Sequence, residues 1–250
     1  MNEEIYHNQF AKLYDYHIEG VEGDVEFYLD FFKDFKGNIL EIGAGTGRIT
    51  IPLAKQGHNI TALDVSKDML EILTNKAKNE GLEIPTLQAD MRDFVFSNER
   101  FDAIIITFRS FQHMYSIADQ LKALHNISGY LNPAGYLVFD VFNPSIEYIA
   151  KGDWQWRPER EINVPEKGLV KIENRNKYDM AKQLMSQETK YLIAGKEEVV
   201  AFEMRFFFRF EVELLLKVAG YDVVKLYGDF KKCEFVSGSP EMVWIVRQSG

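Results

Sequence analysis

The sequence predicts an α/β protein: a mostly parallel, doubly wound sheet of seven strands, with a small antiparallel β element inserted into it. Three observations support this class. Apolar runs of strand length alternate with segments of helical period between residues 38 and 142, glycine and proline turns separate them, and the helical period is lost between residues 145 and 205. Strands that alternate with helices form a parallel sheet covered on both faces, so the first region predicts the sheet and the second the insertion.

The first region supplies five strands, which we expect at residues 38–42, 59–65, 84–88, 101–107 and 136–142. Helices are predicted between them, at residues 46–56, after the N-cap candidate Ser66, and at residues 118–131. A Pro-Ala-Gly run at residues 133–135 is expected to break the helix at residues 118–131 before the fifth strand. Residues 1–36 are predicted to be helical and are rich in aromatic side chains.

The insertion is expected to hold three antiparallel strands, at residues 170–178, 183–193 and 198–208. The third alternates clearly and would place five apolar side chains on one face: Val200, Phe202, Met204, Phe206 and Phe208. We expect Phe206–Phe208 to be core. A helix at residues 211–219 and strands at residues 223–227 and 242–247 complete the main sheet. The predicted organisation is a main domain of residues 1–144 and 206–250 and an inserted β lid of residues 145–205. The lid is expected either to contact the acceptor of the reaction or to form a dimer interface.

Composition narrows the possible partners of this 250-residue chain. The net charge of −9 argues against a nucleic-acid binder and against an anionic membrane surface as a partner. Cys233 is the single cysteine, which excludes an internal disulfide and nearly excludes a cysteine-based zinc site, so no metal is expected. The polar N-terminus and short apolar runs predict neither a signal peptide nor a membrane span. We expect a cytoplasmic monomer or homodimer.

The strongest local motif is the segment Glu41-Ile-Gly43-Ala-Gly45-Thr-Gly47, which directly follows the first strand. Glycines allow a sharp turn and let a ligand approach the backbone, and the free N–H groups of the next helix would point into the same space. The dinucleotide spacing is absent because Arg48 stands where its last glycine would be, and no P-loop lysine follows. Alone, this motif predicts either a nucleotide-type ligand or a tight structural turn.

Two acids follow the next two strands. Asp64 lies 21 positions after Gly43 (64 − 43) and could accept hydrogen bonds from a ribose diol, or could serve the dipole of the following helix. Asp90, between Ala89 and Met91, could accept from an adenine amino group while Met91 covers the ring, or could be a turn acid. Because open α/β sheets bind ligands at the carboxyl ends of their strands, the three motifs together favour a nucleoside-containing ligand.

Taken in order, five segments resemble the successive motifs of class I S-adenosylmethionine-dependent methyltransferases: EIGAGTGR, ALDVSKDML, QADMRDF, FDAIIITFRSFQH and YLNPAGYLVFDVFNP. The match in order and spacing covers residues 38–144. The tail, residues 221–247, resembles a bacterial small-molecule branch that contains aminosugar N-methyltransferase-like proteins. The resemblance implies a Rossmann-like fold, S-adenosyl-L-methionine as cofactor, S-adenosyl-L-homocysteine as product, and a small-molecule acceptor methylated on O, N or C.

The resemblance also implies positions for the cofactor: its methionine part along Gly43, Ala44 and Gly45, its ribose on Asp64, and its adenine beside Ala89, Asp90 and Met91. Val65 and Met69 would pack on the adenosine, and Phe108, after the fourth strand, would also contact the cofactor. Tyr14 resembles an N-terminal tyrosine that closes over the cofactor in related enzymes; its alternative is a place in the core.

Methyl transfer from a sulfonium mainly requires alignment, and a general base is needed only for an acidic or protonated nucleophile. His113 could accept such a proton or could only order its loop. Arg109 could bind a carboxylate or phosphate, or could form a surface ion pair. Trp154 and Arg157 could line the acceptor pocket, or the aromatic side chain could serve only in packing. An RNA or protein methyltransferase and a non-catalytic cofactor-binding protein are the alternatives.

Overall fold

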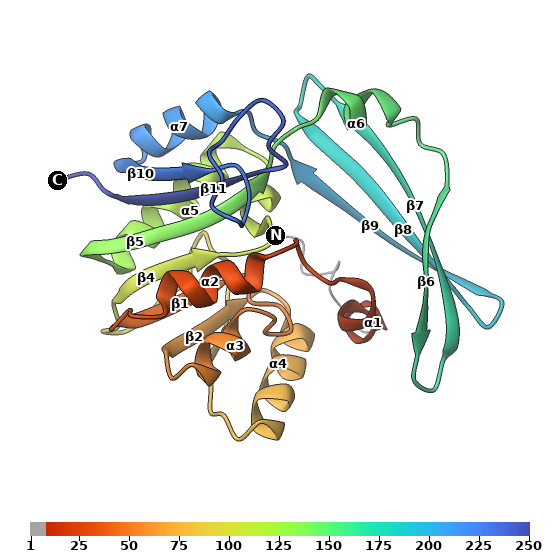
Figure 1. Ribbon diagram of the computed structural model, residues 1–250, viewed down its shortest axis with the longest axis horizontal. Coiled ribbons are helices and arrows are strands. Elements are labelled where there is room, and N and C mark those ends of the chain that lie inside the picture. The colour runs from red at the N-terminus through yellow and green to blue at the C-terminus, as the bar shows by residue number, and fades with distance from the viewer. Residues whose placement is uncertain (1–8) are drawn as a thin grey trace.

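The computed structural model describes residues 9–250 of the chain and divides their strands between two sheets (Figure 1). The large sheet has seven strands: β1 (Asn38–Ile42), β2 (Asn59–Asp64), β3 (Thr86–Gln88), β4 (Phe101–Ile106), β5 (Leu131–Phe142), β10 (Tyr221–Tyr227) and β11 (Glu241–Gln248). The small sheet has four strands: β6 (Arg157–Val164), β7 (Gly168–Asp179), β8 (Leu184–Ile193) and β9 (Lys196–Arg205). The predicted α/β class is confirmed, and the part of the predicted helical N-terminus before residue 9 lies outside the described residues.

The large sheet has the strand order β10–β11–β5–β4–β1–β2–β3. The five neighbouring strands β5, β4, β1, β2 and β3 pair in parallel, whereas β11 pairs antiparallel with both β5 and β10. The carboxyl ends of the parallel strands therefore meet at one edge of the sheet, and the loops that follow β1, β2 and β4 lie next to one another there.

Helices cover both faces of the large sheet. On one side lie α5 (Ile117–Tyr130) and α7 (Arg209–Val218), and on the other lie α2 (Asp24–Phe32) and α3 (Thr50–Lys55). Two neighbouring residues of β1 show the division: Leu40 belongs to the first core and Ile39 to the second, because successive side chains of a strand point to opposite faces. The predicted cap of α4 (Lys67–Asn79) is confirmed, since the Ser66 hydroxyl accepts the N–H of Met69 at 3.3 Å.

Two details of the large sheet differ from the prediction. The helix expected from residue 46 begins only at Thr50, because Gly45 and Gly47 have φ angles of +55° and +87° and hold residues 45–49 in turns. The helix before the fifth strand ends at Tyr130, as expected, but the strand begins already at Leu131 and not at Tyr136, so residues 133–135 lie inside β5. A register shift between Phe101 and Ala103 of the neighbouring strand absorbs the irregularity, so the pairing resumes without a loop.

The small sheet contains four strands, not the three predicted. The missed strand, β6, is an edge strand that pairs only with β7, and most of its side chains are exposed and polar, so it shows no apolar alternation. The predicted inward face of β9 is present at Val200, Phe202 and Met204. Phe206 and Phe207 are buried as expected, but Phe208 is 45% exposed because it caps the start of α7 and has left the sheet.

The two sheets are joined next to the edge where the parallel strands end. The side chain of Gln112, which is fully buried, donates to the carbonyl of Arg205 at 2.7 Å and accepts the N–H of Phe142 at 3.0 Å. Figure 1 shows α1 (Gln9–His17) between the two sheets and α6 (Ile146–Lys151) beside the small one. No helix within residues 9–250 is both long and apolar enough to cross a membrane.

Candidate active site

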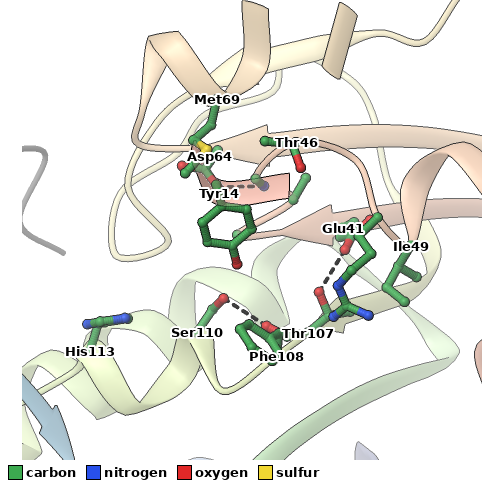
Figure 2. A pocket seen from close by; sticks show the side chains of 14 residues that line it. Tyr14, Glu41, Thr46, Ile49, Asp64, Met69, Thr107, Phe108, Ser110 and His113 are labelled. Carbon is green, nitrogen blue, oxygen red and sulfur yellow. Dashed lines mark hydrogen bonds between the residues drawn. The ribbon is translucent and has the colours of Figure 1, made fainter. Parts of the chain in front are cut away.

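The glycine loop after β1 is tied to the end of β2 by one acid. The Asp64 carboxylate accepts the N–H of Gly45 at 2.8 Å through Oδ2 (Figure 2). It accepts the N–H of Ser66 at 2.8 Å through Oδ1. Burial raises the pKa of Asp64, and these backbone hydrogen bonds oppose the rise. The acid thus holds the start of the next helix and the glycine loop at once.

Two glycines of the loop are needed for different reasons. A Cβ on Gly43, at φ +74°, would lie 2.4 Å from the Ser110 hydroxyl oxygen, so the loops that follow β1 and β4 approach too closely for any side chain. A Cβ on Gly45, at φ +55°, would meet no atom within 4 Å. Gly45 is therefore required by its left-handed backbone, and it faces open space.

A narrow cavity of about 50 Å³ lies against this loop. Figure 2 shows the Tyr14 ring beside Asp64 and Met69 and above Ser110 and Phe108. Eight residues singled out from the sequence line it: Tyr14, Gly43, Ala44, Gly45, Asp64, Met69, Phe108 and His113. Six more were not singled out: Glu41, Thr46, Arg48, Ile49, Thr107 and Ser110. Glu41 carried a usable signal, because it is an acid inside an otherwise apolar strand just before the glycines.

Four other expected cofactor contacts do not line this cavity: Val65, Ala89, Asp90 and Met91. Met91 is fully buried in the core of the large sheet, and its side chain does not reach the cavity wall. Arg92 donates to both oxygens of Asp90, at 2.9 and 2.8 Å. Burial alone would raise the pKa of Asp90, but these bonds prevail and lower it to about 2. The carboxylate is therefore already committed to an ion pair.

Glu41 is buried at the end of β1 and accepts hydrogen bonds from the hydroxyls of Thr50 and of Thr107, the latter at 2.7 Å. Burial raises its pKa to about 7 despite these two bonds, so the group exchanges between acid and carboxylate near neutral pH. On the same wall, Arg48 donates to Asp24 at 2.7 Å, and its guanidinium lies 5.0 Å from the centre of the Phe108 ring. One wall of the narrow cavity thus carries a cation, Arg48, and an acid that titrates near neutral pH, Glu41.

A second cavity, of about 980 Å³, adjoins the first and shares Tyr14, Phe108 and His113 with it. One wall comes from the large sheet and its loops, including Arg109, Phe142, Asn143, Ser239 and Glu241. The opposite wall is the inner face of the small sheet: Asn176, Tyr178, Met185, Gln187, Phe202 and Met204. The cavity is therefore made by both sheets together.

The backbone after β4 is strained where it separates the two cavities. Phe108 and Arg109 are consecutive non-glycine residues with φ angles of +50° and +65°. The Arg109 N–H donates to Oδ2 of Asp140 at 2.9 Å, and its guanidinium forms an ion pair with the buried Glu241. The structure thus gives Arg109 the predicted ion pair, inside the cavity wall and not on the surface. Burial, together with the nearby Glu241 carboxylate, raises the pKa of Asp140 to about 7.

His113 lies at the junction of the two cavities, at the end of a short 3-10 turn, η2 (Ser110–His113). Burial lowers its pKa to about 4, so the ring is neutral at physiological pH. A neutral ring can accept a hydrogen bond, but it is a weak base toward an ammonium. The geometry therefore favours an ordering and binding role over general-base catalysis.

Trp154 and Arg157 do not line the large cavity, which corrects the prediction for both. The Trp154 ring packs against Arg175 and Lys177, at 4.7 and 4.5 Å. On β7 those two residues alternate with Asn176, which faces the cavity, so Trp154 covers the opposite face of the small sheet. Arg157 is exposed and pairs with Asp153 at 2.7 Å. The residue pattern alone does not set the strand register of the insertion, so its inner face could not be assigned in advance.

The strand order, the single antiparallel strand next to one end, and the glycine loop with Asp64 together define an α/β protein with a candidate ligand site at the carboxyl ends of its parallel strands. Comparisons with known proteins agree. Residues 39–135 match the family model described as a methyltransferase domain. The putative methyltransferase YqeM of Bacillus subtilis is 35% identical over 106 residues, which are 42% of this chain and 42% of that relative. The chain thus spans less than half the length of this relative.

Two solved structures share the fold over nearly the whole chain. The CcbJ methyltransferase from Streptomyces caelestis is 22% identical, with a TM-score of 0.83 over 100% of both chains. CalS10, described as an amino pentose methyltransferase from Micromonospora echinaspora and solved with S-adenosylmethionine bound, is 19% identical, with a TM-score of 0.71 over 99% of this chain and 100% of its own. These matches place a methyltransferase domain at residues 39–135 and show that the whole chain shares the fold of the two solved structures.

Proposed function

We propose that the chain methylates a nitrogen atom of a small-molecule amine, with S-adenosylmethionine as the methyl donor. The observation that carries the proposal is the pair of adjoining cavities at the carboxyl edge of the large sheet, which meet at Tyr14, Phe108 and His113. A cavity of about 980 Å³ has the size of a small-molecule site. The shared residues are where a methyl group would pass from one ligand to the other.

The residues of the narrow cavity fit the cofactor. The open space in front of Gly45 lets a ligand lie against the loop, and Asp64 offers a buried acid for a ribose diol. Met69 would pack on the adenosine. We assign Arg48 and Glu41, which were not expected from the sequence, to the carboxylate and the ammonium of the methionine part, because they place opposite charges on one wall.

The chemistry requires little of the protein beyond alignment. When bound, S-adenosylmethionine supplies a methyl group on a sulfonium, and the acceptor must approach it in line at roughly 3–3.5 Å. The strained turn at Phe108 and Arg109 sets that approach, since Phe108 belongs to both cavities and its neighbour is fixed by Asp140 and Glu241.

The charges of the large cavity favour an amine. The large cavity is lined by two acids, Glu147 and Glu241, and by one cation, Arg109, so its wall carries surplus negative potential. That potential attracts an ammonium form of the acceptor. Burial raises the pKa of Glu241, which suits this group to take the proton that the amine releases. The description of CalS10 as an amino pentose methyltransferase agrees with this acceptor class.

We further propose that residues 145–205 are an inserted element whose inner face binds the acceptor. Its support is the set of side chains that β7, β8 and β9 direct into the large cavity. Residues that select a substrate often lie on such insertions, whereas the cofactor is bound by the loops of the underlying sheet.

Two measurements test the proposed function. Calorimetry should show binding of S-adenosylhomocysteine by the wild type and weaker binding by Asp64→Ala. Incubation with methyl-labelled cofactor and a small-molecule extract should then label compounds that carry an amino group. Absence of binding would overturn the cofactor site, and label found only on oxygen or carbon would overturn the amine assignment.

A further inference from the structure

The first helix is attached firmly to the small sheet. Leu13 is buried in a cluster with Val170, Ile172 and Tyr191 of that sheet. The ring of His17 bonds the Tyr191 hydroxyl at 2.7 Å through Nδ1, and its Nε2 lies 3.0 Å from the Glu159 carboxylate. Because the apolar cluster is buried and the polar contacts of His17 lie beside it, α1 and the small sheet form one packed unit.

The connection of α1 to the large sheet is of a different kind. Asp15 accepts a hydrogen bond from the Thr46 hydroxyl at 2.5 Å through Oδ1. Its Oδ2 forms an ion pair with Lys76 of α4 at 3.0 Å. Thr46 is almost fully buried inside the glycine loop. One carboxylate therefore joins the helix to the loop that forms the floor of the narrow cavity and to the helix that follows β2.

The residue before Asp15 closes the narrow cavity. Tyr14 lines both cavities, and Phe10 and Ile18, four positions before and after it, line the large one. Residues four apart lie on one face of a helix, so this face covers both cavities. The narrow cavity measures about 50 Å³, far less than a nucleoside needs, so the residues that line it, Tyr14 among them, must move apart when the cofactor enters.

We infer that Asp15 is a positioning residue for the cofactor site: it latches α1 onto the glycine loop and so holds Tyr14 over the cofactor. The inference rests on the proposed function. The latch suits this role because it is reversible. Asp15 is 38% exposed and Lys76 39%, and ion pairs of such exposure are weak, so α1 can leave the loop while it keeps its buried contacts with the small sheet. A latch of this kind acts mainly on how fast the ligand leaves.

The test measures S-adenosylhomocysteine binding and release by stopped-flow mixing, with the full chain. Asp15→Ala should release the ligand about tenfold faster, the effect of losing roughly 1.4 kcal/mol, while the association rate changes much less. Asp15→Asn should fall between this variant and the wild type, because its amide oxygen still accepts from Thr46 but its charge for Lys76 is gone. Lys76→Met should resemble Asp15→Asn, since it removes the same ion pair from the other side.

Asp30→Ala is the matched control. Asp30 is also a surface aspartate with lysine partners, Lys33 at 3.0 Å and Lys232, but it lines neither cavity. Its variant should release the ligand at the wild-type rate. The melting temperatures of the ligand-free Asp15 and Asp30 variants should agree within about 2 °C, as expected for surface substitutions.

The outcomes separate the inference from the function beneath it. If Asp15→Ala releases the ligand at the wild-type rate while Asp64→Ala binds poorly, the latch is wrong and the cofactor site stands. A loss of affinity matched by an equal loss of ligand-free stability would make Asp15 merely structural and would also overturn the inference. Failure of the wild type to bind S-adenosylhomocysteine would overturn both.

Discussion

Asp64 accepts the backbone N–H of Gly45 across 2.8 Å, so the acid that ends β2 fixes the loop that follows β1. The two residues are 19 positions apart, and their strands are neighbours in the large sheet. A ligand that uses the acid must therefore also lie against the glycine.

This relationship predicts two separable effects of Asp64→Ala. Cofactor affinity should fall by roughly 1–3 kcal/mol, the cost of unpairing a charged hydrogen bond, and the melting temperature should fall because the Gly45 N–H loses its acceptor. Calorimetry with S-adenosylhomocysteine and thermal denaturation measure the two effects. Asp64→Asn, which keeps one carbonyl oxygen, should recover part of the stability. Unchanged affinity in a folded Asp64→Ala variant would contradict the ribose assignment.

The two loop glycines should respond differently to substitution. Gly45→Val should abolish cofactor binding and leave most of the fold, since its side chain enters open space on the ligand's path and strains the turn. Gly43→Ala should cost more stability than an alanine at Gly45, because its Cβ meets Ser110. Melting temperatures compare the two alanine variants, and calorimetry follows binding. Normal cofactor affinity in Gly45→Val would mean that the loop is only structural.

The faces of the small sheet predict which substitutions alter acceptor turnover. Gln187→Leu on the inner face should raise KM for the acceptor severalfold. The Gln187 side chain lies opposite Asn176 across the sheet, and the substitution removes its polar amide from the cavity wall. Trp154→Ala and Arg157→Ala, on the outer face and at the edge, should leave KM and kcat unchanged. Affinity for S-adenosylhomocysteine should stay within about 1 kcal/mol in all three.

The rival account of the same element is dimerisation, and size-exclusion chromatography separates the two. A Gln187→Leu variant that turns over the acceptor normally, alongside a Trp154→Ala variant that changes the oligomeric state, would make residues 145–205 an assembly element.

Asp140 predicts a change of stability with pH. Its pKa is raised from the ordinary value of 3.8 to about 7, so the folded state holds a proton that the unfolded state releases between those values. The group favours folding at low pH, and this contribution is lost as the pH rises through 7. Asp140→Asn, which stays neutral and can still accept from the Arg109 N–H, should therefore be stabilised relative to wild type at pH 8, on the order of 1–3 kcal/mol, and little changed at pH 4.

Thermal denaturation of both proteins from pH 4 to pH 8 measures this difference. A constant difference in melting temperature over the whole range would show that Asp140 does not titrate between the two values. Glu41, whose pKa is also raised to about 7, remains in both proteins and therefore cancels in the comparison.

The sequence by itself determined the large sheet and the centre of the narrow cavity. Gly43, Gly45 and Asp64 could be found because a glycine turn and a strand-end acid are local features, and because parallel strands bring their carboxyl ends to one edge. The tertiary structure decided everything that depends on register or on distant packing. It buried Met91, committed Asp90 to Arg92, and turned Trp154 to the outer face of the small sheet. It also joined Asp15 to Thr46 across 31 positions. Such contacts leave no mark in a single sequence, because a one-residue change of strand register or a rotation of a helix exchanges the faces while the residue pattern stays the same.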